Sequence, residues 1–244
     1  MTGRLLRPRL GIVGGLGPLA TADFYRKTID AVPAETDADH ISMAILSVPQ
    51  IPDRSRAIRE GSDKPLPWLL EAIDILNNLD VEIIAIACNT AHHWYDALSA
   101  GSRAEIIHIA DAAIGELHRQ YKGSRTAVMA TRGTLRSGFY QKRLQEAGLG
   151  CHNPMRPAFQ RAVDDAIRQV KLGNLAQAKR ACAAAFEWCR EDGLEAAILA
   201  CTELPIAAED VVPEGMLAID ASRALALTCV QRLRNPDRMR NTTM

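Results

Sequence analysis

The sequence lacks net charge and lacks any long apolar run. Lysine plus arginine and aspartate plus glutamate each number 29, so the formal net charge is zero. A neutral chain has no overall field that would concentrate nucleic acid or an anionic membrane around it. No apolar stretch reaches the roughly 20 residues that a membrane-spanning helix needs. We therefore expect a globular protein with neither nucleic acid nor a membrane as its partner.

The cysteines lack the short spacings that mark a disulfide framework or a zinc site. The sequence has six of them, and no two form a C-x-x-C pair. Free thiols without such spacing fit a reducing compartment, so we expect a cytoplasmic protein. The chain also has no convincing lysine motif for pyridoxal phosphate and no cluster of metal ligands. We predict that it uses no cofactor and no metal.

Residues 81–95 are the stretch around which the chain is organised. The apolar run 83–87 is short and rich in β-branched residues, which predicts a buried parallel strand. Cys88, Asn89 and Thr90 follow this run directly. In open α/β sheets, ligands bind at the carboxyl ends of the strands, where the N–H groups of the next helix favour an anion. Cys88 is therefore a candidate catalytic residue.

The same arrangement returns later in the chain. A second apolar run, 196–200, ends in Cys201, Thr202 and Glu203. Free cysteines are often buried, so each of the two could be an ordinary core residue. Two cysteines at strand ends, each followed by threonine within two residues, instead favour two halves that face one cleft.

These observations predict the fold class. With 244 residues and 48% hydrophobic residues, the chain is long enough for two domains with cores of their own. We expect an α/β protein of two similar lobes, each a mostly parallel sheet flanked by helices. Pseudo-twofold symmetry would relate the lobes and place the active site between them. The predicted first lobe is 1–104 plus 215–244 and carries Cys88; the predicted second lobe is 105–214 and carries Cys201.

A glycine-rich turn follows the first predicted strand. Gly15, Gly17 and Ala20 fit G-x-G-x-x-A, so a dinucleotide site has to be considered. That fingerprint also needs an acidic residue at the end of the second strand, to bind the ribose hydroxyls. The second predicted strand, 40–47, is preceded by acidic residues and is followed by valine, proline and glutamine. The turn is better interpreted as part of a substrate pocket wall, through Gly15 and Leu16.

Two opposed thiols suit proton transfer across a carbon. One thiolate can remove an α-hydrogen while the other thiol protonates the opposite face, which inverts the centre. An ordinary cysteine pKa of about 8.5 makes both ionisation states reachable near neutral pH. His92 and His93 permit a rival, a Cys-His nucleophile for acyl or amidine hydrolysis, in which Cys201 has no role. A non-catalytic amino-acid-binding protein is a third possibility.

Six motifs in order resemble the aspartate racemase family. They read GIVGGLGPLATADFY, VPQIPDRS, ACNTAHHWYDAL, ATRGTLRSGFY, VKLGN and ILACTELP, and they extend from residue 10 to about residue 220. The resemblance implies cofactor-independent interconversion of L- and D-aspartate, and usually a homodimer. It also implies that Arg54 and Lys171 bind the carboxylates of the substrate. Glutamate or a broader range of amino acids remains an alternative, because Ser47 and Val48 stand where aspartate racemases often have asparagine.

The predicted site combines the residues at the strand ends with those that the resemblance adds. Cys88 and Cys201 are the predicted catalytic residues, acting on a small amino-acid substrate. Glu203 stands where related glutamate racemases have a histidine, so it is expected to orient the amine or to assist Cys201. The predicted substrate-binding residues are Gly15, Leu16, Gln50, Arg54, Asn89, Thr90, Thr131, Thr134, Lys171, Thr202 and Glu203.

Overall fold

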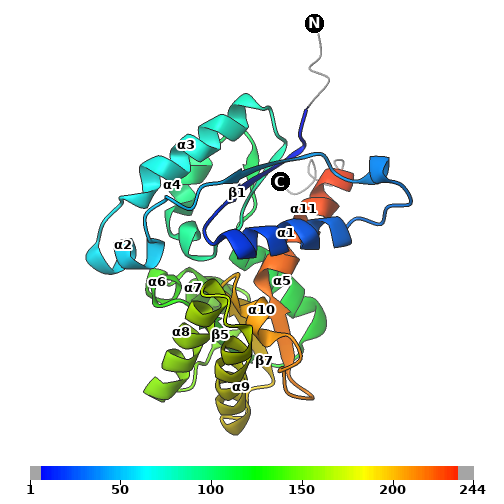
Figure 1. The fold of residues 1–244 in the computed structure, drawn as a ribbon. Coiled ribbons are helices and arrows are strands. Elements are labelled where there is room, and N and C mark those ends of the chain that lie inside the picture. Colours follow the sequence, from blue (N-terminus) through cyan, green and yellow to red (C-terminus); the bar gives the residue numbers. More distant parts are fainter. Residues whose placement is uncertain (1–6, 236–244) are drawn as a thin grey trace, which may run out of the picture.

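Two four-stranded parallel sheets form the centre of the molecule (Figure 1). The structure is a computed structural model, and it describes residues 7–235. The order of the first sheet is β2-β1-β3-β4 and that of the second is β6-β5-β7-β8, so the second half repeats the topology of the first. The strands are β1 Leu10–Gly14, β2 Met43–Ser47, β3 Ile83–Ile86, β4 Glu105–Ile106, β5 Arg125–Ala130, β6 Gly150–Cys151, β7 Ala196–Ala200 and β8 Leu217–Asp220. The predicted α/β fold of two similar lobes is confirmed.

The inner strands β1, β3 and β7 are buried along their whole length. Strands that helices cover on both faces need apolar side chains in both directions, which is why these segments read as continuous apolar runs. Figure 1 shows α3 and α4 beside the first sheet, and α8 and α9 below beside the second. The helices are α1 Pro18–Asp30, α2 Arg54–Glu60, α3 Pro65–Asn78, α4 Tyr95–Ala100, α5 Ile109–Gln120, α6 Arg132–Ser137, α7 Phe139–Glu146, α8 Pro157–Lys171, α9 Leu175–Glu191, α10 Leu204–Ala208 and α11 Ala221–Arg234, with short 3-10 helices at Asp37–Asp39 and Thr90–Trp94.

The two sheets share one apolar cluster. It contains Ile12 of β1 and Ile198 of β7, and it is continued by buried residues of α5 and α11. Helix α11 lies against both α5 and α1. Two smaller clusters lie on the outer faces, one under α3 and the other under α8 and α9. The lobes are therefore joined by packing as well as by the chain. No helix among residues 7–235 is long and apolar enough to cross a membrane.

The predicted lobe boundaries are wrong at two strands. The short strand β4 pairs with β3 and belongs to the first sheet, although the prediction began the second lobe at residue 105. Strand β8 pairs with β7 and belongs to the second sheet, although the prediction placed residues 215–244 in the first lobe. In both cases the strand pairs with a segment that is distant in sequence, and this pairing determines which sheet the strand joins. Residues 1–6 and 236–244 of the predicted first lobe lie outside the described part.

The segment 48–67 has four prolines, a pattern that predicts a long loop, but it contains the helix α2. Asp53 caps this helix by accepting a hydrogen bond from Arg56 N at 2.6 Å. Gly61 ends it in the left-handed conformation, with φ at 63°. Both are ordinary start and stop signals, which the prolines around them obscure. The helix holds Arg54 at its first position and so fixes where that side chain begins.

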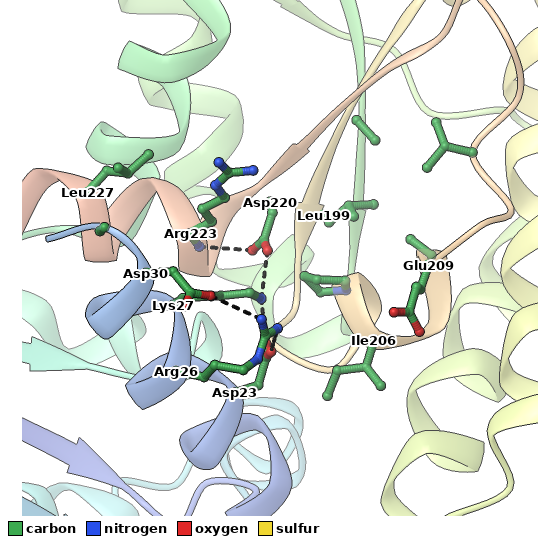
Figure 2. A pocket seen from close by; sticks show the side chains of 15 residues that line it. Asp23, Arg26, Lys27, Asp30, Leu199, Ile206, Glu209, Asp220, Arg223 and Leu227 are labelled. Atoms are coloured by element: carbon green, nitrogen blue, oxygen red, sulfur yellow. Dashed lines mark hydrogen bonds and ion pairs between the residues drawn. The ribbon is translucent and has the colours of Figure 1, made fainter. Parts of the chain in front are cut away.

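A buried lysine links α1 to the start of α11 (Figure 2). Lys27 is 8% exposed, and its Nζ forms ion pairs with Asp23 and, at 2.6 Å, with Asp220. It also donates a hydrogen bond to Ser222 Oγ at 2.9 Å. Asp220 caps α11 by accepting hydrogen bonds from Ser222 N and Arg223 N. One cation thus holds an element of the first sheet's lobe against β8 of the second.

A cavity of about 550 Å³ lies beside this ion-pair cluster, between α1 and α10. Figure 2 shows its charged side chains on α1 and its apolar wall at Leu199 and Ile206. Its lining among the described residues includes neither cysteine nor histidine. It lacks the thiols around which the predicted chemistry is built, so the candidate active site lies elsewhere.

Replacing Lys27 by methionine should destabilise the protein strongly, because the partly buried carboxylates of Asp23 and Asp220 would lose the cation that they share. Breaking a buried ion pair from one side typically costs about 3–5 kcal/mol. Urea denaturation would measure the change in the free energy of unfolding. The matched control is Arg26→Met on the same helix. The Arg26 side chain is 65% exposed, and its surface ion pairs should contribute at most about 1 kcal/mol. Equal losses in the two variants would contradict this assignment.

Candidate active site

Cys88 lies just beyond the end of β3, where the strand turns away from the sheet. The Ala87 N–H donates a hydrogen bond to Val13 O of the neighbouring strand at 2.9 Å. The next N–H, that of Cys88, instead donates to Ile86 O of its own segment at 2.7 Å. A 3-10 helix begins at Thr90. Cys88 is a free thiol and only 6% exposed. The predicted position at a strand's carboxyl end is confirmed.

Cys201 occupies the corresponding position after β7 and is also 6% exposed. Both cysteines line one cavity, although β3 and β7 belong to different sheets. The carboxyl ends of the two sheets therefore face one another across this cavity. Its volume is about 20 Å³, which is close to the space that one water molecule needs. The site is closed in this structure.

The cavity brings together most of the predicted site residues. The predicted residues that line it with the cysteines are Leu16, Arg54, Asn89, Thr90, Thr131, Lys171, Thr202 and Glu203. The prediction missed Asp53 and Ser55, which also line it. The sequence could have indicated both residues, because they lie on either side of Arg54 at the start of α2, a helix that the prediction did not include. Three predicted residues, Gly15, Gln50 and Thr134, do not line the cavity.

These three lie behind or beside the site. Gln50 is exposed in a turn after β2. Gly15 has a φ of +82°, and a Cβ there would lie 2.3 Å from Val48 N, so the position requires glycine to let the two turns approach. Thr134 is fully buried. That any of them contacts substrate stays a prediction, and the structure gives Gly15 and Thr134 supporting positions instead.

Three hydroxyl groups connect the lobes next to Cys88. Thr90 Oγ1 lies 2.9 Å from Thr131 Oγ1 and 3.0 Å from Thr134 Oγ1. Thr131 and Thr134 are themselves 3.0 Å apart through the same atoms, and Thr131 caps α6 by accepting from Thr134 N. A hydroxyl both donates and accepts, so the triangle satisfies all three groups. It sets the distance between the turn after β3 and the turn after β5.

Asn89 is held by a tyrosine from the opposite lobe. Tyr140 is fully buried, and its hydroxyl donates to Asn89 Oδ1 at 2.6 Å. Burial raises the pKa of Tyr140 well above its ordinary value, so the hydroxyl keeps its proton. Because Oδ1 is occupied, the amide presents Nδ2, which is buried and has no hydrogen-bond partner among the described residues. Asn89 therefore supplies N–H donors at the wall of the cavity.

Cys201 is hydrogen bonded to a carboxylate. Its Sγ donates to Glu203 Oε2 at 3.0 Å, and Thr202 Oγ1 donates to the same oxygen at 3.3 Å. Glu203 is only 3% exposed. Burial, and then the charge of Glu203, raise the pKa of the Cys201 thiol well above its ordinary value. The Cys201 sulfur thus lies where its neutral form is favoured.

Lys171 is on the other side of Glu203. Its Nζ lies 3.7 Å from Glu203 Oε1, an oxygen with no hydrogen-bond partner among the described residues. Burial lowers the pKa of Lys171, but the acidic groups around it, Glu203 first among them, raise it by more, and the net shift is upward. Lys171 is therefore a cation at the wall of the cavity, with its side chain 44% exposed.

Arg54 already uses much of its guanidinium group on the backbone. It donates to the carbonyl oxygens of Ile51, at 3.0 Å, Pro52, at 3.2 Å, and Leu16, at 2.8 Å. These bonds hold α2 against the glycine-rich turn. Its Nε is buried without a hydrogen-bond partner among residues 7–235. One donor of the guanidinium is thus free on a side chain that lines the cavity.

His92 is positioned against the backbone of Cys88 and not against its thiol. His92 Nδ1 lies 2.9 Å from Cys88 O, and the side chain is 2% exposed. Burial lowers the pKa of His92 to about 4, so the ring is neutral at physiological pH. His93 is exposed and contacts Ser137 Oγ at 2.9 Å. Neither histidine forms the thiol contact that the Cys-His hydrolase alternative needs.

Three kinds of comparison with known proteins agree. A family model described as Asp/Glu/Hydantoin racemase matches residues 13–229. Broad specificity amino-acid racemase RacX of Bacillus subtilis is 29% identical over 225 residues, covering 91% of this chain and 96% of that protein. The structure of Picrophilus torridus aspartate racemase is 28% identical with a TM-score of 0.80, covering 91% of this chain and 92% of that one. Glutamate racemase from Francisella tularensis, solved with D-glutamate, shares the fold at 18% identity and a TM-score of 0.68, covering 98% and 86%.

The buried neutral state of His92 should make stability depend on pH. The unfolded chain protonates this ring below about pH 6.5, whereas the folded protein does so only near its pKa of about 4. The unfolded state therefore binds more protons between these values, and stability should fall by roughly 3 kcal/mol as the pH drops from 6.5 to 4. Urea denaturation across this range would show the loss.

The variant His92→Gln should flatten that pH dependence by the same amount, because the titrating ring is gone. The matched control is His93→Gln, which replaces an exposed histidine whose pKa burial lowers by a smaller amount, so this variant should change the slope less. If His92→Gln left the slope unchanged, His92 would not be held neutral in the folded protein.

Proposed function

Because the chain belongs to the Asp/Glu/hydantoin racemase family, we propose that it inverts the α-carbon of an amino acid by proton transfer between Cys88 and Cys201. The observation that carries the proposal is the meeting of two thiols from opposite lobes at one cavity. A one-base enzyme or a Cys-His hydrolase would have no use for the second thiol. The names of the two relatives, an amino-acid racemase and an aspartate racemase, support the reaction class.

In the proposed reaction one cysteine acts as base and the other as acid. The thiolate of one removes the α-hydrogen as a proton, and the electron pair of the broken C–H bond moves into the α-carboxylate. The thiol of the other then donates its proton to the opposite face of the carbon. The reverse direction starts from the opposite protonation states.

The difficult part is the weak acidity of the α-hydrogen. The carboxylate gains enediolate character as the proton leaves, so preorganised donors around it lower the barrier. Asn89 Nδ2, oriented by the Tyr140 hydroxyl, is a donor at this wall that has no partner in the described part of the chain. Removal of one such donor typically costs about 3 to 4 kcal/mol. Thr90, bonded to Thr131 and Thr134, holds the neighbouring turn in place.

Aspartate is the substrate that we propose within this class. Within residues 7–235 the Nε–H of Arg54 has no hydrogen-bond partner, and Lys171 is a cation at the same cavity. A guanidinium and an ammonium together suit a substrate with two carboxylates. Glutamate meets the same requirement, and a broad range is the alternative that RacX represents by its name. A homodimer and a cytoplasmic location stay predictions of the sequence.

Racemisation in deuterated water, without added cofactor, tests the reaction. The wild-type protein should convert both enantiomers of aspartate and introduce deuterium at the α-carbon. Cys88→Ser and Cys201→Ser should each lower inversion by roughly 10²–10⁴-fold, the usual contribution of a general acid or base. Each variant keeps one thiol, so any residual exchange should occur on opposite enantiomers in the two variants. Chiral chromatography and proton NMR would measure inversion and exchange.

The variant Cys182→Ser is the matched control, because Cys182 is a buried core thiol of α9 that does not line the cavity. It should keep wild-type inversion. A hydrolase would show no exchange and would not depend on Cys201, and a binding module would show neither exchange nor inversion. Wild-type protein that binds amino acids but leaves the α-hydrogen in place would refute the proposal.

The substrate assignment has its own test. Arg54→Ala and Lys171→Ala should lower kcat/KM for aspartate about 10- to 100-fold, because each loses a charge-assisted contact worth roughly 1.5–3 kcal/mol. Turnover of alanine or serine should change much less. The matched control is Arg56→Ala in the same helix, whose side chain is 71% exposed and pairs with Glu60. Equal losses on acidic and neutral substrates would show that Arg54 and Lys171 do not recognise the side chain.

A further inference from the structure

The two cysteines have different surroundings, although they occupy equivalent places in the two lobes. Cys201 Sγ donates a hydrogen bond to Glu203 Oε2 at 3.0 Å. No carboxylate is bonded to the Cys88 sulfur among the described residues, and the residue after it is the neutral Asn89. A carboxylate accepts a hydrogen bond from a thiol, whereas it repels a thiolate at the same distance.

Glu203 is fixed in this position from several sides. Thr202 Oγ1 donates to Oε2, the oxygen that also accepts from Cys201. Lys171 Nζ lies 3.7 Å from Oε1. A Cβ at Gly17 would lie 2.9 Å from the same oxygen, so the glycine-rich turn lies directly against the carboxylate. Glu203 is therefore placed to act on Cys201 and has little freedom to turn towards another partner.

We propose that Glu203 is a positioning residue that holds the proton on Cys201 in the free enzyme, so that Cys88 acts first as the base. The inference rests on the proposed racemase function and deepens it. The free enzyme would then be ready for the enantiomer whose α-hydrogen faces Cys88. After that turnover Cys88 carries the abstracted proton and Cys201 is a thiolate beside Glu203. Water then returns a proton to Cys201 and accepts one from Cys88, which restores the starting state.

The effect of Glu203 can be isolated in variants that keep a single thiol. In Cys88→Ser only Cys201 can exchange the α-hydrogen, and the proton held by Glu203 should keep this exchange slow. Adding Glu203→Gln keeps a hydrogen-bond acceptor of the same shape but removes the charge. The exchange in deuterated water at pH 7 should then rise about tenfold for each unit by which the Cys201 pKa falls.

The matched pair is Cys201→Ser and Cys201→Ser/Glu203→Gln. Here only Cys88 reacts, so removal of the Glu203 charge should not produce the rise in exchange that it produces when Cys201 is the remaining thiol. A structural or substrate-binding role of Glu203 would instead lower exchange in both backgrounds, and that result would overturn the proposal. Wild-type protein without any exchange or inversion would be a different result, because it would refute the racemase function itself.

A second measurement needs no change at Glu203. In Cys88→Ser, the exchange rate should keep rising through pH 9, because burial and the Glu203 charge raise the pKa of the remaining Cys201 thiol. Alkylation of Cys201 by iodoacetamide, followed by peptide mapping, should show the same pH dependence in the absence of substrate. Exchange and alkylation that level off below pH 8 would show that Cys201 ionises readily, and the proposal would be wrong.

Discussion

The chemistry of this protein depends on a constraint of parallel sheets. A strand such as β3 or β7 is covered on both faces, so its own side chains are committed to the core. Polar and reactive groups can emerge only where the strand ends, and in a parallel sheet all carboxyl ends meet at one edge. Both catalytic candidates lie directly after such an end. Two sheets with their edges turned toward one another are what a reaction on two faces of one carbon needs.

The contacts between the lobes follow from this arrangement. At the cavity they are polar and specific, as in the hydroxyl triangle at Thr90 and the bond from Tyr140 to Asn89. Away from the cavity they consist of the shared apolar cluster and of Lys27 between Asp23 and Asp220. The first group sets donor positions near the reacting atoms, and the second keeps the two halves of one chain together.

The sequence was informative wherever a local signal fixed the structure. The apolar runs before Cys88 and Cys201 predicted the strands, and the strand ends predicted the site. The sequence was uninformative where the structure depends on pairing between distant segments. Strand β8 is an example, because its short segment does not indicate which sheet it joins. The helix α2 was missed because prolines surround it. Tyr140 was missed as a partner of Asn89, because a contact across 51 residues leaves no trace in the spacing.

The closed cavity limits how substrate can reach the thiols. About 20 Å³ is too little for an amino acid, so lining residues must separate before one enters. Beside the cavity the lobes also touch between α2 and α6, where a Cβ at Gly133 would lie 2.8 Å from Ser55 Cα. Arg54 precedes Ser55 on α2 and is bonded to the turn at Leu16. Any movement that separates α2 from α6 therefore carries the proposed carboxylate-binding arginine with it, so substrate entry and substrate recognition depend on the same helix.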